Sequence, residues 1–111
     1  MIHKGLGPER WFTFSLFEQL ANVGTDIERV IFWRKNNNKE QSEKAFERAL
    51  ELLDLTIADK KNRGSTLKEL VRMREALVDY FVFDNEYGST DKAWQDYFFA
   101  FNYAAALAKG K

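Results

Sequence analysis

Apolar residues recur at helical spacing in four stretches of this chain. The stretches cover about residues 9–35, 39–59, 65–83 and 90–109. In the first, the apolar positions advance in steps of three and four residues, which places their side chains on one face of an α-helix. The pattern therefore predicts four amphipathic helices. The stripe of the first helix consists of Leu16, Leu20, Val23, Ile27 and Val30.

Short turn signals separate the four stretches. Residues 36–38, 62–64 and 85–88 are rich in Asn and Gly, and Pro8 precedes the first stretch, where its missing N–H costs nothing. Connections this short make neighbouring helices antiparallel. We therefore expect an all-α, antiparallel up-down-up-down four-helix bundle, with an N-terminal tail of residues 1–8 and a single domain over residues 9–109.

The starts of the third and fourth helices carry residues that cap helices. Thr66 and Glu69 have the spacing of a capping box, in which two side chains satisfy the first backbone N–H groups. Ser89 or Thr90 can cap the fourth helix, and Asp91 favours its positive end. Both helices are therefore expected to begin close to these residues.

Two residues on the expected apolar faces allow two interpretations each. Gly24 either lets a neighbouring helix pack close or is a glycine that the helix merely tolerates. Arg74 lies in the seam of the third helix. A buried guanidinium there needs a carboxylate partner, and such an ion pair would set register or line a ligand pocket. The candidate partners are Glu18, Asp26 and Glu47. Alternatively, Arg74 lies at the edge of the seam and extends to water.

The fourth helix is apolar on nearly all sides. Trp94 and Phe98 share one face, yet Phe99, Tyr103 and Ala106 leave much of the remainder apolar too. Surplus apolar surface usually marks an interaction site. We therefore expect a homo-oligomer whose interface contains Phe99, Tyr103 and Ala106. The alternative is that aromatic residues near the helix ends cover the ends of the bundle.

Charge is balanced overall but uneven along the chain. The 17 basic and 17 acidic residues give a formal net charge of +0, so the protein as a whole does not attract nucleic acid or an anionic membrane. The expected fold nevertheless gathers four cations at one end, where they would meet phosphate or an acidic protein partner. Ordinary solubilising charge is the other interpretation of this patch. The four cations are Lys60, Lys61, Arg63 and Lys68.

Residues suited to catalysis or metal binding are scarce. The chain has no cysteine, and its single histidine, His3, lies in the expected tail. Di-iron bundles need paired Glu-x-x-His motifs. The acidic residues 84–91 lack the spacing of a calcium loop, and the sequence has no phosphate-binding glycine loop. We therefore expect a protein that is not an enzyme and has no metal, cofactor or catalytic residue.

The expected location is the cytoplasm. Residues 1–8 lack the apolar run of a signal peptide, and no apolar stretch of the sequence is long enough to span a bilayer. A chain without cysteine also has no disulfide, the bond typical of oxidising compartments.

Residues 17–22, 45–57 and 84–91 resemble a group of small uncharacterised bacterial four-helix proteins. The resemblance covers most of the chain and implies no particular activity. In architecture alone, the chain is similar to the four-helix-bundle proteins encoded in ribosomal RNA intervening sequences and to their retroelement accessory relatives, which assemble into rings and are thought to contact nucleic acid. We therefore expect a self-associating interaction or scaffold protein, with a nucleic-acid-binding accessory protein as the alternative.

Overall fold

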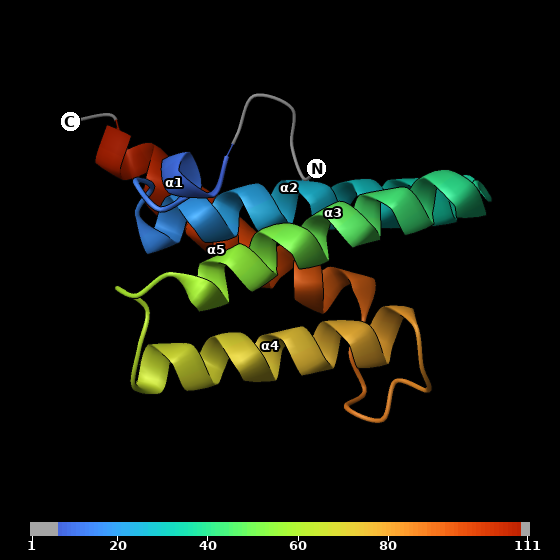
Figure 1. The fold of residues 1–111 in the computed structure, drawn as a ribbon. Helices are drawn as coiled ribbons and strands as arrows, with labels where there is room; N and C mark the ends of the chain where they lie inside the picture. Colours follow the sequence, from blue (N-terminus) through green and yellow to red (C-terminus); the bar gives the residue numbers. More distant parts are fainter. Residues whose placement is uncertain (1–6, 110–111) are drawn as a thin grey trace.

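A computed structural model describes residues 7–109 of the chain, the side chain of Lys109 excepted. Over this range the fold is all-α, as the apolar spacing predicted, with five helices and no strand (Figure 1). None of the helices in the described range is long and apolar enough to cross a membrane. The helices are α1 (Pro8–Trp11), α2 (Leu16–Lys35), α3 (Lys39–Ala58), α4 (Ser65–Phe81) and α5 (Asp91–Lys109).

The expected first helix is split in two, which corrects the prediction of one helix over residues 9–35. Ser15 interrupts it by forming a capping box with Glu18. The Glu18 N–H donates to Ser15 Oγ at 3.1 Å, and the Ser15 N–H donates to Glu18 Oε1 at 2.9 Å. Pro8 belongs to α1 and not to a tail, while residues 1–6 of the expected tail lie outside the described range.

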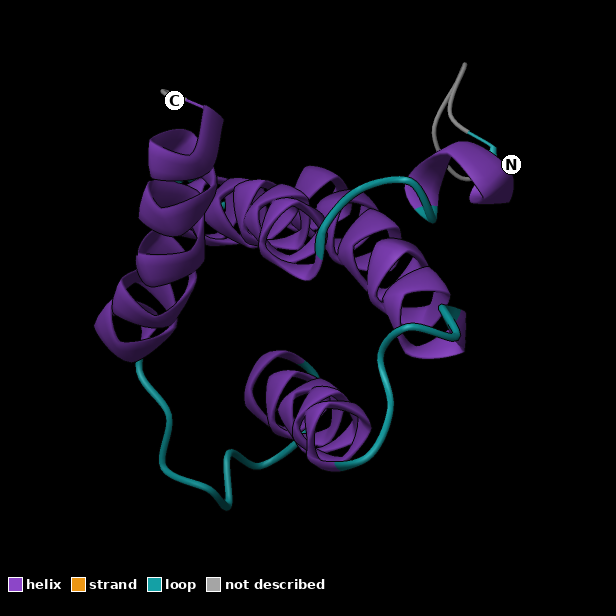
Figure 2. Cartoon of the chain, turned by 90° about the vertical axis from the view of Figure 1, so that its left-hand side faces the viewer, coloured by secondary structure: helices purple, strands orange, loops and turns teal. Residues whose placement is uncertain are grey.

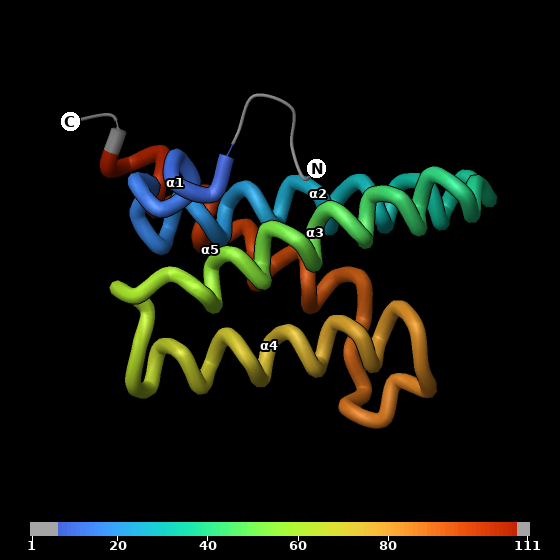
Figure 3. Tube along the Cα trace, viewed as in Figure 1, coloured from blue at the N-terminus to red at the C-terminus, as the bar shows by residue number. Residues whose placement is uncertain are grey.

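The helix α2 makes the most extensive contacts with other helices. It packs along α3 and against α5, whereas α4 packs on α3 below them (Figures 1 and 3). Figure 2 shows α5 inclined to the other three long helices. Because of this inclination, the backbones of α4 and α5 scarcely approach each other.

The core forms where apolar stripes of the helices meet. Side chains with almost no exposure include Ile27 of α2, Leu53 of α3 and Leu77 of α4. Phe98 of α5 joins the same cluster. Burial is unevenly shared, since α2 buries eight residues and α4 only three.

The two predicted helix starts differ in outcome. Thr90 caps α5 as expected, because its Oγ1 accepts the N–H of Ala93 at 3.0 Å. The capping box predicted for Thr66 and Glu69 does not form, since α4 begins after Gly64 without a side-chain cap. Gly64 has φ 65°, a backbone conformation that glycine adopts without steric cost.

Candidate interaction site on α2 and α5

The outward face of α5 carries an apolar stripe. Phe99 and Tyr103 are 65% and 58% exposed, and their rings stack with centroids 6.3 Å apart and an interplanar angle of 18°. Leu107, four residues further on, is 54% exposed. Positions four apart lie on one helix face, so the three side chains form a continuous outer stripe. Ala106, the third residue of the predicted interface, is exposed beside it.

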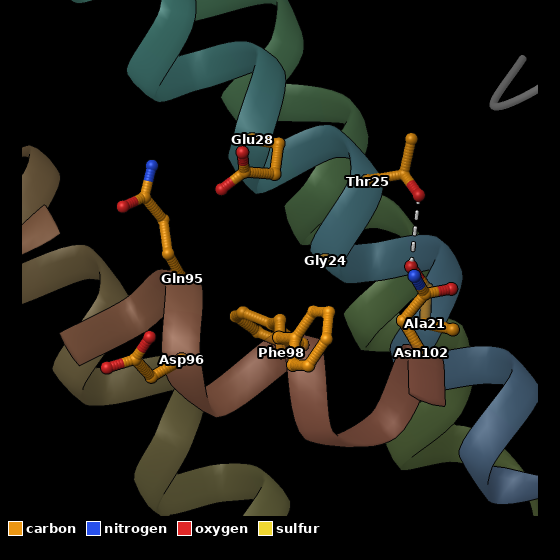
Figure 4. Close-up of a pocket in the computed structure, with 9 residues that line it drawn as sticks. Ala21, Gly24, Thr25, Glu28, Gln95, Asp96, Phe98 and Asn102 are labelled. Carbon is orange, nitrogen blue, oxygen red and sulfur yellow. Dashed lines mark hydrogen bonds between the residues drawn. The ribbon is translucent and has the colours of Figure 1, made fainter. Parts of the chain in front are cut away.

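Gly24 is the point of closest approach between α2 and α5. A Cβ atom built on Gly24 would lie 2.6 Å from the Cβ of Phe98, closer than real carbon atoms approach. Of the two interpretations of this glycine, the structure therefore supports close packing. Figure 4 shows the two residues facing each other where the helices cross.

A surface groove follows the crossing of α2 and α5. One half has a volume of about 380 Å³ and extends from Glu28 and Gln95 to Asn102 (Figure 4). The other half, of about 280 Å³, continues towards Phe14 and Ala106. The halves share Ala21, Thr25 and Asn102 among their lining residues, so we treat them as one α2/α5 groove.

The rim of the α2/α5 groove is acidic. Glu28 and Asp96 line the first half, and Glu18 lines the second. No Lys or Arg is present among the described residues that line either half. Asp96 pairs with Lys92 at 2.8 Å on the surface of α5, whereas Glu28 forms no ion pair within the described range. The charged side chains among the described residues that line the groove are therefore all acidic, on a protein of no net charge.

The opposite side of α5 faces a smaller hollow next to α4. This hollow of about 320 Å³ is lined by Met73, Ala76, Trp94 and Tyr97, among others. Burial, with a smaller effect from the Glu69 carboxylate, raises the pKa of Tyr97 above its ordinary value. The indole N–H of Trp94 is buried without an acceptor among the described residues. One polar group of α5 is therefore left unsatisfied beside α4, although the Tyr80 hydroxyl of α4 donates to Asp91 Oδ1 of α5 at 2.7 Å.

A buried hydrogen-bond network, which sequence reasoning missed, joins α1 to α2 and α3. The Trp11 indole donates to Thr56 Oγ1 at 3.1 Å. Gln19 Nε2 donates to the Trp11 carbonyl at 3.0 Å and to Asp59 Oδ2 at 2.9 Å. Asn62 Nδ2 donates to Gln19 Oε1 at 3.2 Å. A usable signal was the position of Gln19 beside the apolar stripe of α2, because a polar residue there needs partners.

This network engages one of the four cations of the predicted patch, Lys61, and leaves the other three outside it. Lys61 donates to the Asp59 carboxylate and to the Phe12 carbonyl, the latter at 3.3 Å. Lys60, Arg63 and Lys68 are exposed and form no ion pair within the described range. The structure thus leaves three of the four predicted cations available at the α3–α4 turn.

The network also shifts the titration of Asp59. Burial by itself raises the pKa of this carboxyl, but hydrogen bonds from Lys61 and Gln19 outweigh that effect. The pKa of Asp59 consequently lies below its ordinary value of 3.8. Asp59 is therefore a buried carboxylate stabilised in its charged form.

Arg74 pairs with a different carboxylate from those predicted. Its Nε donates to Asp54 Oδ1 at 2.7 Å, and both side chains are partly exposed, at 37% and 56%. The buried acid among the candidates, Asp26, instead contacts Arg29 at 2.9 Å and Arg48 at 3.9 Å. This corrects the expected pairing and supports the interpretation in which Arg74 lies at the seam edge.

The other two candidate partners of Arg74 lie elsewhere. Glu18 belongs to the capping box of α2, and Glu47 is exposed on α3. Within the described residues, no group of three or more acidic, histidine or cysteine side chains is placed to hold a metal ion. Comparison with protein-family models, curated proteins and solved structures finds no match to this chain.

Proposed function

We propose that this chain is a cytoplasmic, non-enzymatic interaction module that self-associates through the outer stripe of α5. In this proposal the four long helices form an antiparallel bundle that is open between α4 and α5. The observation that carries it is the exposed stack of Phe99 and Tyr103. Ring pairs of this kind usually lie in cores and interfaces, because each ring removes a large apolar area from water.

The size of the stripe supports the proposal. Aromatic side chains carry about 150–250 Å² each, so the exposed parts of Phe99, Tyr103 and Leu107 make up on the order of 300 Å². The largest apolar patch on a soluble monomer is about 300–600 Å² and is often functional, and the stripe has the size of such a patch. The patch borders the α2/α5 groove, since Phe99 lines that groove as well.

Sedimentation equilibrium at micromolar concentrations tests this function. We expect a mass near twice 13.0 kDa, or a higher multiple, for the unaltered chain. The double variant Phe99→Ser with Tyr103→Ser should sediment as a monomer. Phe83→Ser is the matched control, because Phe83 is 70% exposed and lies outside α5. A monomeric unaltered chain, or dissociation by the control variant, would contradict the proposal.

A second candidate function is that of a nucleic-acid-binding accessory protein. It is favoured by one observation, the three exposed cations Lys60, Arg63 and Lys68 at the α3–α4 turn, which form no ion pair within the described range. Binding of RNA or DNA should weaken steeply with salt. Replacing all three cations by Ala should abolish it, whereas Lys39→Ala at the far end of α3 should have little effect. Absence of binding at low salt would eliminate this candidate.

A further inference from the structure

We infer that the α2/α5 groove binds a basic amphipathic α-helix from another protein. The inference goes beyond self-association, which uses the outer stripe of α5; the two surfaces share Phe99. The groove has the shape for a helix, and its rim has the charge opposite to that of a basic ligand. The shape of the groove and the charge of its rim come from different residues.

Small side chains make up part of the lining of the groove, which favours the close approach of a helix. Ala21 and Thr25 line it from α2, and Ala105 and Ala106 line its second half from α5, whereas Gly24 is already covered by Phe98. Small residues allow the backbone of a packed helix to approach closely. From Glu18 to Glu28 the groove follows α2 for roughly 15 Å, at 1.5 Å per residue, which is about three turns of a bound helix.

An apolar contact is available along one side of this floor. Phe99 lines the first half of the groove and is 65% exposed. Phe14 lines the second half and is partly buried. Helices that dock into grooves insert apolar side chains at positions i, i+3, i+4 and i+7. One phenylalanine lines each half of the groove, so such side chains would meet an aromatic ring in either half.

The charge of the rim favours a basic partner over a second copy of this chain. Glu28 and Asp96 both line the first half of the groove, and Figure 4 shows them on opposite helices. The outward face of α5 offers Lys92 as a cation, and Lys92 already pairs with Asp96. A second copy that presents α5 would therefore leave Glu28 without a counter-ion. A helix with Lys or Arg beside its apolar stripe supplies one, and complementary charge of this kind favours encounter and register.

The test uses a synthetic fluorescent helix of about 18 residues, made of Leu, Ala and Lys with one apolar stripe and long enough to be helical. Fluorescence anisotropy measures its binding to the full chain. The variant Glu28→Lys with Asp96→Lys should weaken binding about tenfold or more. The control Glu47→Lys with Glu75→Lys makes the same change of net charge on exposed positions of α3 and α4, and should change binding less than about twofold.

A second variant tests the groove without changing its charge. Thr25→Trp places a large side chain on an exposed position at the shared centre of both halves, and it should abolish peptide binding. Circular dichroism verifies that each variant retains its helices. A peptide of the same composition with a scrambled order, which lacks the apolar stripe, should not bind.

Three results would overturn the inference: equal binding of the scrambled peptide, equal weakening by the control pair of substitutions, or unimpaired binding to Thr25→Trp. Loss of self-association in Thr25→Trp, without peptide binding to the unaltered chain, would show that a second copy occupies the groove. The self-association proposal fails separately, since a monomeric chain that binds the peptide removes that proposal alone.

Discussion

The helices α2 and α4 are of similar length, 20 and 17 residues, but they are held in the fold in different ways. α2 is covered by α3 and α5 and buries eight residues, including the polar Gln19 and Asp26. α4 packs on α3 and leaves a hollow towards α5. Both helices have clear apolar stripes in the sequence, so amphipathic spacing alone does not determine how firmly a helix is held. The extent to which neighbouring helices bury it also contributes.

This difference predicts where the fold opens first. Local opening is cheapest where few apolar side chains are buried. Amide hydrogens of α4 should therefore exchange faster than those of α2 and α3. Four mutational tests examine the comparison quantitatively, from the largest expected effect to the smallest.

The largest effect is expected in the contact between α2 and α3. Leu53 of α3 and Leu77 of α4 are both fully buried. Leu53→Ala should lower the free energy of unfolding by about 3–5 kcal/mol, and Leu77→Ala by about 2–3 kcal/mol, because α4 can settle into the space left behind. Urea denaturation measures both, with the exposed Val71→Ala as control. Equal losses would mean that α4 is held as firmly as α3.

Asp59 provides a pH-dependent test of the network at the α1 side of α2. Its lowered pKa means that the charged form stabilises the fold fully above about pH 3.8, and that this contribution is lost as the pH falls through the folded-state pKa. Asp59→Asn should cost about 1–3 kcal/mol at neutral pH, with a smaller difference at pH values below that pKa. Unfolding at both pH values measures it. The exposed Asp84→Asn serves as control, and a pH-independent loss would contradict the assignment.

Gly24→Ala tests the closest approach of α2 and α5. Alanine is the better helix former by about 1 kcal/mol, yet its Cβ would collide with the Cβ of Phe98. Because that atom is fixed to the backbone of α5, the collision should outweigh the propensity, with a net loss of about 1–2 kcal/mol. Thermal unfolding measures the loss, and Thr25→Ala at the next position should be close to neutral. A more stable Gly24→Ala variant would show that α5 shifts freely on α2.

The smallest effect concerns Arg74 and Asp54, which join α4 to α3 at the surface. A double-mutant cycle with Ala at both positions should give a coupling below about 1 kcal/mol, since exposed ion pairs are screened by water and salt. The coupling should decrease further in high salt. A larger, salt-independent coupling would indicate that α4 is anchored more firmly than its burial suggests.

The sequence was sufficient for the helical class and for most helix limits, because apolar spacing and turn residues act locally. α3 was expected to end at about residue 59 and ends at Ala58. The break before α2 was missed although Ser15 and Glu18 have the spacing of a capping box. Apolar spacing alone does not reveal this break, because the break depends on the Ser15 cap.

The candidate site was predictable only in part. The exposure of Phe99 and Tyr103 follows from a helix that is apolar on more sides than its neighbours cover. The α2/α5 groove depends on the inclination of α5, which no local pattern encodes. Partners of charged side chains depend on how each helix is rotated about its axis, and that is why Asp54, not the candidates on α2, contacts Arg74.

The fluorescence of the buried Trp94 indole can report the difference in burial between α2 and α4. Trp11 is hydrogen-bonded in the α1–α3 network, Trp33 is partly exposed near the end of α2, and Trp94 lines the hollow beside α4. Indole emission moves to longer wavelength when water reaches the ring. Detachment of α4 should therefore shift the emission of Trp94 to longer wavelength before the emission of Trp11 shifts. The intrinsic fluorescence of the unlabelled chain then reports which part of it has opened.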